Sequence, residues 1–184
     1  MVNTAVSSVF AYVATNIDDL FILMLLYTAA RGAKQNTQIV SGRYAGIFLL
    51  VAAGCLGAYG LQTFAGRYLP LMGLIPIALG IKELFSAEED DTQIEYRRNM
   101  IMTTALMTIA SGRDNIGVYT ALFARWKLPQ LSVMAVVFAV MTAVWCIIGR
   151  KLAYMPLLQK MLTQHRKKIV PLVYISLGIY IMIK

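Results

Sequence analysis

Three aspartates lie inside long apolar stretches of this sequence, where a carboxylate has no water around it. Asp18 and Asp19 are adjacent in the first stretch, and Asp114 lies about half a chain further on. A charged side chain at the bilayer centre costs roughly 2.5–3.5 kcal/mol on insertion scales, and such residues usually line an ion or proton pathway. The acids therefore predict a site for a transported cation; the alternative is that they cap a helix break or pair with a nearby arginine.

The residues around these acids repeat. Residues 14–19 and 110–115 both read alanine, a hydroxyl residue, two variable residues, aspartate, and then aspartate or asparagine. Carboxylate, amide and hydroxyl oxygens suit hard divalent ions such as Mg²⁺, Ca²⁺ and Mn²⁺ better than thiophilic metals. The predicted metal ligands are Asp18, Asp19, Asp114, Asn115, Thr15, Asn16 and Ser111.

Arg113 directly precedes the third acid, and its positive charge opposes cation binding by Coulomb repulsion. We expect it to pair with one of the three aspartates in one conformation and to release it in another. Arg113 is therefore interpreted as a gating or charge-pairing residue rather than as a metal ligand.

A regular helix cannot point Asp18 and Asp19 at one narrow spot, because consecutive helical residues face about 100° apart. Either the two carboxylates face different surroundings, or the helix is broken there. Residues 15–18 and 111–112 are of types that favour local backbone hydrogen bonds over helix continuation. An unwound turn at mid-membrane would expose carbonyl oxygens for ion coordination.

The composition is typical of a polytopic membrane protein. Of 184 residues, 59% are hydrophobic and only 14% are charged, which is unusual for a soluble domain. The net charge of +8 does not indicate a nucleic-acid partner, because the basic residues lie between apolar stretches that lipid would surround. Six stretches approach the roughly 20 residues that a membrane-spanning helix needs. They cover residues 5–29, 45–64, 69–85, 100–123, 131–148 and 169–183.

Three predicted helices in each half imply an inverted repeat, because an odd number of crossings makes the second half run opposite to the first. The first and fourth helices, which correspond in this scheme, contain the aspartates. We therefore expect an all-α integral membrane protein with six transmembrane helices in two inverted three-helix repeats. The expected divisions are 1–86 for the first repeat, 87–98 for an acidic cytoplasmic linker and 99–184 for the second repeat.

Lysine and arginine are concentrated after the first, third and fifth predicted helices, and the positive-inside rule places that side in the cytoplasm. Both termini are then expected to be extracytoplasmic. The residues assigned to the cytoplasmic side are Arg31, Lys34, Arg43, Lys82, Arg97, Arg98, Arg150, Lys151, Lys160, Arg166, Lys167 and Lys168. Those assigned to the other side are Arg67, Arg125, Lys127 and Lys184.

Two pairs of small residues are spaced by one helical turn, Gly42 with Gly46 and Ala53 with Gly57. Such pairs let two helices approach closely in a membrane. We interpret them as packing features rather than as part of a binding site.

Four segments spread over nearly the whole chain form a recognisable set. They are TNIDDL at residues 15–20, GLIPIALGIK at 73–82, SGRDNIGVY at 111–119 and VYISLGIY at 173–180. Together they resemble the bacterial cadmium-resistance transporters, a family within the lysine-exporter superfamily. The resemblance implies a multi-pass exporter of divalent metal ions in a bacterial plasma membrane, not an enzyme, with Asp18 and Asp114 as the matching site acids. Two positions depart from the family pattern: Arg113 stands where a small residue is typical, and Ala121 where proline is common.

We therefore expect an exporter of divalent metal cations, cadmium or a related ion, driven by protons as counter-ion or by the membrane potential. No cofactor besides the transported ion is expected, and a homodimer is compatible with this plan. One alternative is export of cationic amino acids or other organic cations, in which Arg113 would bind a substrate carboxylate. Another is a membrane thiol–disulfide conduit that uses Cys55 and Cys146. These cysteines lack CxxC or zinc spacing, and we interpret them as packing residues.

Overall fold

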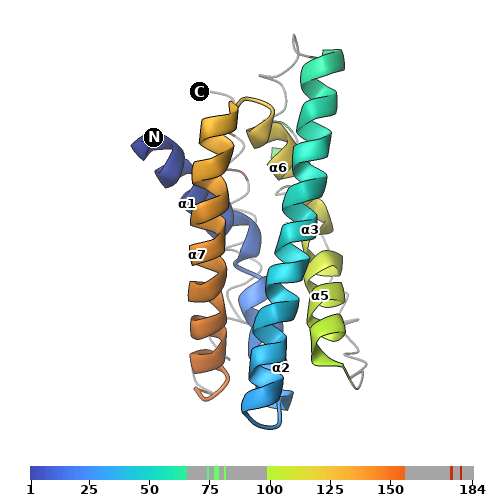
Figure 1. Cartoon of the computed structure of the whole chain (residues 1–184), viewed down its shortest axis with the longest axis vertical. Coiled ribbons are helices and arrows are strands. Elements are labelled where there is room, and N and C mark those ends of the chain that lie inside the picture. Colours follow the sequence, from blue (N-terminus) through green and yellow to red (C-terminus); the bar gives the residue numbers. More distant parts are fainter. Residues whose placement is uncertain are drawn as a thin grey trace.

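The computed structural model describes residues 1–65 and 99–155, together with six isolated helical positions at 74, 77, 78, 81, 175 and 179. Every element in this part of the chain is a helix, which confirms the all-α prediction (Figure 1). The elements are α1 (Val2–Asn16), α2 (Asp19–Ala29), α3 (Ala33–Ala65), α5 (Met100–Ser111), the 3₁₀ helix η2 (Gly112–Asp114), α6 (Asn115–Phe123) and α7 (Leu128–Leu152).

Two of these helices are long and apolar enough to cross a membrane, α3 over Ala33–Leu61 and α7 over Leu128–Leu152. The α1 and α2 helices pass the same test as a third span when they are taken together, with a bend of 63° between them. The fourth predicted stretch is formed by α5, η2 and α6. The third and sixth predicted helices and the linker at 87–98 lie outside the described residues, apart from the isolated positions.

The second predicted helix begins earlier than expected, at Ala33 rather than near residue 45. Arg43 therefore lies inside α3 and is fully buried, so its interpretation as a loop residue that sets orientation is wrong. The apolar pattern alone missed this start, because the first turns of α3 are polar and continue the helix without adding hydropathy.

At the end of α1, two side chains bond back to carbonyls of the preceding turn, a local pattern that disfavours continuation of the helix. Thr15 Oγ1 donates to the carbonyl of Ala11 at 2.9 Å, and Asn16 Nδ2 donates to that of Tyr12 at 2.9 Å. Asp18 Oδ1 then accepts from the backbone N–H of Asp19 at 3.1 Å, which caps the start of α2. The predicted break at this motif is confirmed.

The second break has a different local geometry. The α5 helix ends at Ser111, and Gly112 follows with φ −88° and ψ 6°, outside the helical region. The chain makes one 3₁₀ turn over Gly112–Asp114 before α6 begins at Asn115. Both motif repeats therefore interrupt their helices at the same place, beside the aspartates.

The long helix of each half packs against the broken helix of the other half. The α3 helix lies along α5 and α6, and α7 lies along α1 and α2 (Figure 1). In Figure 1, α1 and α2 run from the upper to the lower end of the molecule and α3 returns, whereas α5 and α6 run upward and α7 returns. The two described halves thus run in opposite directions.

Glycines allow this close packing of α3. A Cβ atom on Gly46 would lie 2.6 Å from the Cβ of Thr108, and one on Gly42 would collide with the carbonyl of Ile101. Both contacts join α3 to α5, as the small-residue pair predicted. The α3 backbone is therefore held directly beside the second broken helix.

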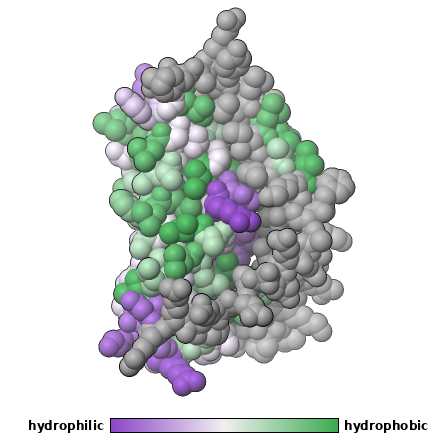
Figure 2. Space-filling model, turned by 90° about the vertical axis from the view of Figure 1, so that its right-hand side faces the viewer, coloured by the Kyte–Doolittle hydropathy of each residue, from purple (hydrophilic) through white to green (hydrophobic). Residues whose placement is uncertain are grey.

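The outer surface is apolar and the interior is partly polar. Phe48, Leu56 and Val136 are 70%, 74% and 66% exposed, respectively, as expected for side chains that face lipid. Figure 2 shows hydrophobic side chains over most of the height of one face, with hydrophilic ones at its lower end and in a patch at mid-height. Arg43, Asp19 and Asn16 are, by contrast, buried.

Candidate functional site: a buried polar centre between two helix breaks

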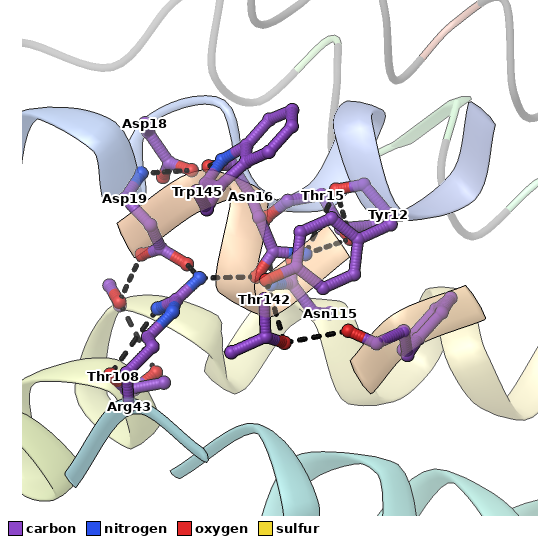
Figure 3. Close-up of polar contacts among 12 residues, drawn as sticks. Tyr12, Thr15, Asn16, Asp18, Asp19, Arg43, Thr108, Asn115, Thr142 and Trp145 are labelled. Carbon is purple, nitrogen blue, oxygen red and sulfur yellow. Dashed lines mark hydrogen bonds and ion pairs between the residues drawn. The ribbon is translucent and has the colours of Figure 1, made fainter. Parts of the chain in front are cut away.

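The two helix breaks touch each other. Asn115 Nδ2, at the start of α6, donates to the backbone carbonyl of Thr15 at 2.8 Å. Ser111 Oγ, at the end of α5, donates to Asp19 Oδ1 at 2.6 Å. Motif residues that are far apart in the chain are thus joined in one centre, which Figure 3 shows in close-up.

Arg43 reaches this centre from α3. Its NH2 group lies 2.7 Å from Asp19 Oδ2 and 2.7 Å from Asn16 Oδ1, and its NH1 group lies 3.3 Å from Thr108 Oγ1 (Figure 3). The Asp19 and Arg43 side chains are each 1% exposed, so both charges are removed from solvent. Removing one partner of such a pair typically costs about 3–5 kcal/mol, because the other charge is left uncompensated.

Aromatic residues surround the same centre. The Tyr119 hydroxyl lies 3.0 Å from Thr15 Oγ1 and accepts from Asn16 Nδ2 at 3.1 Å. Trp145 Nε1, from α7, donates to the carbonyl of Asn16 at 2.7 Å. Tyr12 packs edge-on against Trp145 and donates to Thr142 at 3.1 Å. These contacts join the end of α1 to α6 and α7.

The predicted ligands fall into two groups. Thr15, Asn16, Asp19 and Asn115 are buried in the centre, and Ser111 joins them while remaining partly exposed. Asp18 and Asp114 are half-buried at the breaks. Asp18 is the N-cap of α2 and Asp114 the N-cap position of α6.

Arg43 is paired with the motif acid Asp19, and Arg113 is exposed on η2. Sequence reasoning missed Arg43 because it was assigned to a loop. A usable signal was present, since Arg43 lies between Gly42 and Gly46, a pair that already predicted helix packing at this point. The other contributors that sequence reasoning missed are Tyr12, Thr108, Tyr119, Thr142 and Trp145.

The centre is suited to hold positive charge. It offers the Asp19 carboxylate, the Asn16 amide oxygen and several hydroxyls. The C-terminal ends of α1 and α5 and the N-terminal ends of α2 and α6 all lie beside it, so the partial charges of the helix ends oppose one another. Within residues 1–65 and 99–155, no three His, Cys, Asp or Glu side chains form a group that could hold a metal ion.

A helical protein with an apolar exterior and a buried charged centre at two broken helices has the architecture of a membrane transporter. The sequence profile of the family described as Cadmium resistance transporter (Cad) matches residues 12–184. The chain belongs to this family and is a membrane transporter rather than an enzyme. Searches of curated protein sequences and of solved structures gave no significant match.

Proposed function

We propose that the protein exports divalent metal cations, cadmium or a related ion, and that the polar centre between the two breaks is its transport site. The observation that carries this proposal is the meeting of the two motif repeats. Asn115 contacts Thr15 and Ser111 contacts Asp19, although these pairs are 100 and 92 residues apart in the chain, respectively. The structure gives Asp18 a capping role and pairs Asp19 with Arg43, as the alternative interpretation of the acids expected. The proposal adds that the buried Asp19 carboxylate also binds the transported cation during the cycle.

In the proposed cycle the cation enters from the cytoplasm and is bound by Asp19 together with neutral oxygens from Asn16, Thr15, Ser111 and Asn115. The half-buried acids Asp18 and Asp114 lie at the breaks and attract the cation toward the centre or complete its shell in another conformation. Arg113, exposed beside them, acts as a gate by repelling a second cation.

We further propose that the two halves are inverted repeats. In the motif alignment Thr15 corresponds to Ser111, and Asp19 to Asn115. The contact of Ser111 with Asp19 is therefore the counterpart of the contact of Asn115 with Thr15. The opposite directions of the described halves support the same plan, in which rocking of one half against the other exposes the centre alternately to each side.

The expected test of the site uses amide replacements. Asp19→Asn should abolish cadmium resistance in cells and lower Cd²⁺ affinity by about a hundredfold, since a unit charge at ligand distance is worth several kcal/mol at an effective dielectric constant of about 20. Asp18→Asn and Asp114→Asn should also reduce resistance. Growth of cells that carry each variant on a panel of toxic metals measures the loss of resistance and identifies the transported metal. Full resistance to every metal in all three variants would contradict the site.

Two serines distinguish the loss of a cation ligand from a nonspecific effect of substituting serine by alanine. Ser111 bonds to Asp19, whereas Ser132 is exposed on α7 and bonds to a carbonyl in its own helix. Ser111→Ala should weaken Cd²⁺ binding several-fold, and Ser132→Ala should leave it unchanged. Calorimetry of Cd²⁺ binding to each purified variant measures the two affinities, and equal affinities would contradict a ligand role for Ser111.

Energy coupling is proposed to come from protons that replace the cation on Asp18 and Asp114, or from the membrane potential. Purified protein in liposomes with an imposed pH gradient should move Cd²⁺ faster than without one if protons are the counter-ion. Transport that follows only an imposed potential would assign the coupling to voltage instead.

A further inference from the structure

One feature of the centre has no place in a simple metal site: its acceptor oxygens are already occupied by a positive charge. Arg43 Nη2 lies 2.7 Å from both Asp19 Oδ2, one of the two carboxylate oxygens, and the amide oxygen Oδ1 of Asn16. A cation and the guanidinium cannot hold these atoms at the same time.

We infer that Arg43 is a built-in substitute for the transported cation, which neutralises Asp19 when the transporter is empty and is displaced when metal binds. This inference rests on the proposed function of the centre. The proposed function names the residues that bind the cation, whereas this inference gives Arg43 a role in the return of the empty transporter.

The electrostatic reason lies in the burial of Asp19. The carboxylate is 1% exposed and its ion-pair partner in the described structure is Arg43. An exporter must bring its empty site back to the cytoplasmic side in every cycle. Without a counter-charge, that step would carry an uncompensated carboxylate through a site closed to water, which is strongly unfavourable.

The geometry also allows Arg43 and the cation to replace each other reversibly. Gly42 and Gly46 hold the α3 backbone on either side of Arg43 against α5, so the Arg43 side chain stays close to the centre after a cation displaces it. Within the part of the chain that the structure describes, Arg43 Nε has no hydrogen-bond partner, and the NH1 contact with Thr108 is long at 3.3 Å. The two shortest hydrogen bonds of the guanidinium are thus made to oxygens for which the cation competes.

Removing this competitor should have opposite effects on two measurable steps. Arg43→Gln should raise Cd²⁺ affinity by about tenfold, because the repelling charge is gone. It should also lower net Cd²⁺ efflux at least several-fold, because the empty site no longer returns in a neutral form. Exchange of Cd²⁺ across the membrane with Cd²⁺ on both sides needs no empty return and should persist.

The experiment uses the full-length protein in liposomes, with radioactive Cd²⁺ to measure net efflux and exchange, and calorimetry to measure affinity. Lys34→Gln, which removes an exposed positive charge from the same helix, is the matched control and should behave as wild type. The double variant Asp19→Asn with Arg43→Gln removes both charges of the buried pair, and should fold but fail to bind Cd²⁺ with wild-type affinity.

Arg43→Lys keeps the inference testable if the glutamine variant does not fold. An ammonium group is a point charge that bridges two oxygens less well than a guanidinium. Arg43→Lys should therefore raise Cd²⁺ affinity moderately and retain net efflux. A Cd²⁺ affinity at or below that of wild type in both folded variants, or equal loss of exchange and efflux, would overturn the inference. Absence of Cd²⁺ binding and transport in the wild-type protein would instead overturn the proposed function.

Discussion

At the scale of single residues, two adjacent aspartates of the same motif have different surroundings. Asp19 is 1% exposed and is bonded to Arg43 and Ser111, whereas Asp18 is half-buried and caps α2. The bend between α1 and α2 produces this difference, because it turns the first residue of α2 toward α3 and α5. We therefore expect Asp19 to determine cation affinity more strongly than Asp18.

Tyr119 offers a residue-scale prediction. Its buried hydroxyl contacts both Thr15 and Asn16 at the break of α1. Tyr119→Phe should lower the thermal stability of the protein in detergent by an amount equivalent to about 1–2 kcal/mol, since two polar groups lose a partner without a change in packing. Tyr154→Phe removes a hydroxyl from a residue that is 71% exposed and should have no measurable effect. Equal melting curves for both variants would contradict this account of the break.

At the scale of helices, the polar centre exists because two interrupted helices are held together by two continuous ones. The α3 helix lies along α5 and α6, and α7 lies along α1 and α2. Each contact is made close by a small residue, such as Gly46 against Thr108 and Gly149 against Leu23. Arg43 reaches Asp19 only because α3 approaches α5 at this short distance.

Two glycines of α3 test this point. A Cβ on Gly46 would lie 2.6 Å from Thr108, whereas one on Gly60 would meet no atom of the described residues within 4 Å. Gly46→Ala should destabilise the protein by about 1–3 kcal/mol, because the helices must move apart, and it should also impair Cd²⁺ efflux. Gly60→Ala should be neutral or slightly stabilising. Melting curves in detergent measure the stability of each variant, and liposomes measure its Cd²⁺ efflux. If the two variants behave alike, the close contact between α3 and α5 is not required.

At the scale of the whole molecule, the described elements support the proposed orientation. The α2–α3 connection, the start of α5 and the end of α7 lie at one end in Figure 1, and the α6–α7 connection lies at the other. The first end contains Arg31, Lys34, Arg150 and Lys151. The positive-inside rule then assigns this end to the cytoplasm even after Arg43 is removed from the count.

Lys34 and Lys127 are exposed at opposite ends and allow a direct test of orientation. In a background in which Cys55 and Cys146 are replaced by alanine, a membrane-impermeant maleimide should label Lys127→Cys in intact cells. It should label Lys34→Cys only after permeabilisation. The opposite pattern would reverse the proposed orientation. Efflux by the background itself should be unchanged, since a thiol–disulfide conduit alone would need these cysteines.

The sequence by itself determined the class of protein and the place of its polar centre. Apolar stretches of helical length establish a membrane protein, because backbone groups in lipid must be bonded internally. The repeated motif also predicted the break at Asp18 and Asp19, because its side chains compete with helix hydrogen bonds. These are local properties, which the order of residues alone expresses.

Only the tertiary structure decided which charges meet. Asp18 and Asp19 are adjacent residues of the same type, and Arg113 is nearer in sequence to a motif acid than Arg43 is. The buried ion pair is nevertheless formed by Asp19 and Arg43. The choice depends on the bend of one helix and on the close approach of another through Gly42 and Gly46. Since ion pairing depends on distance and burial in space, no periodicity in the chain could reveal it.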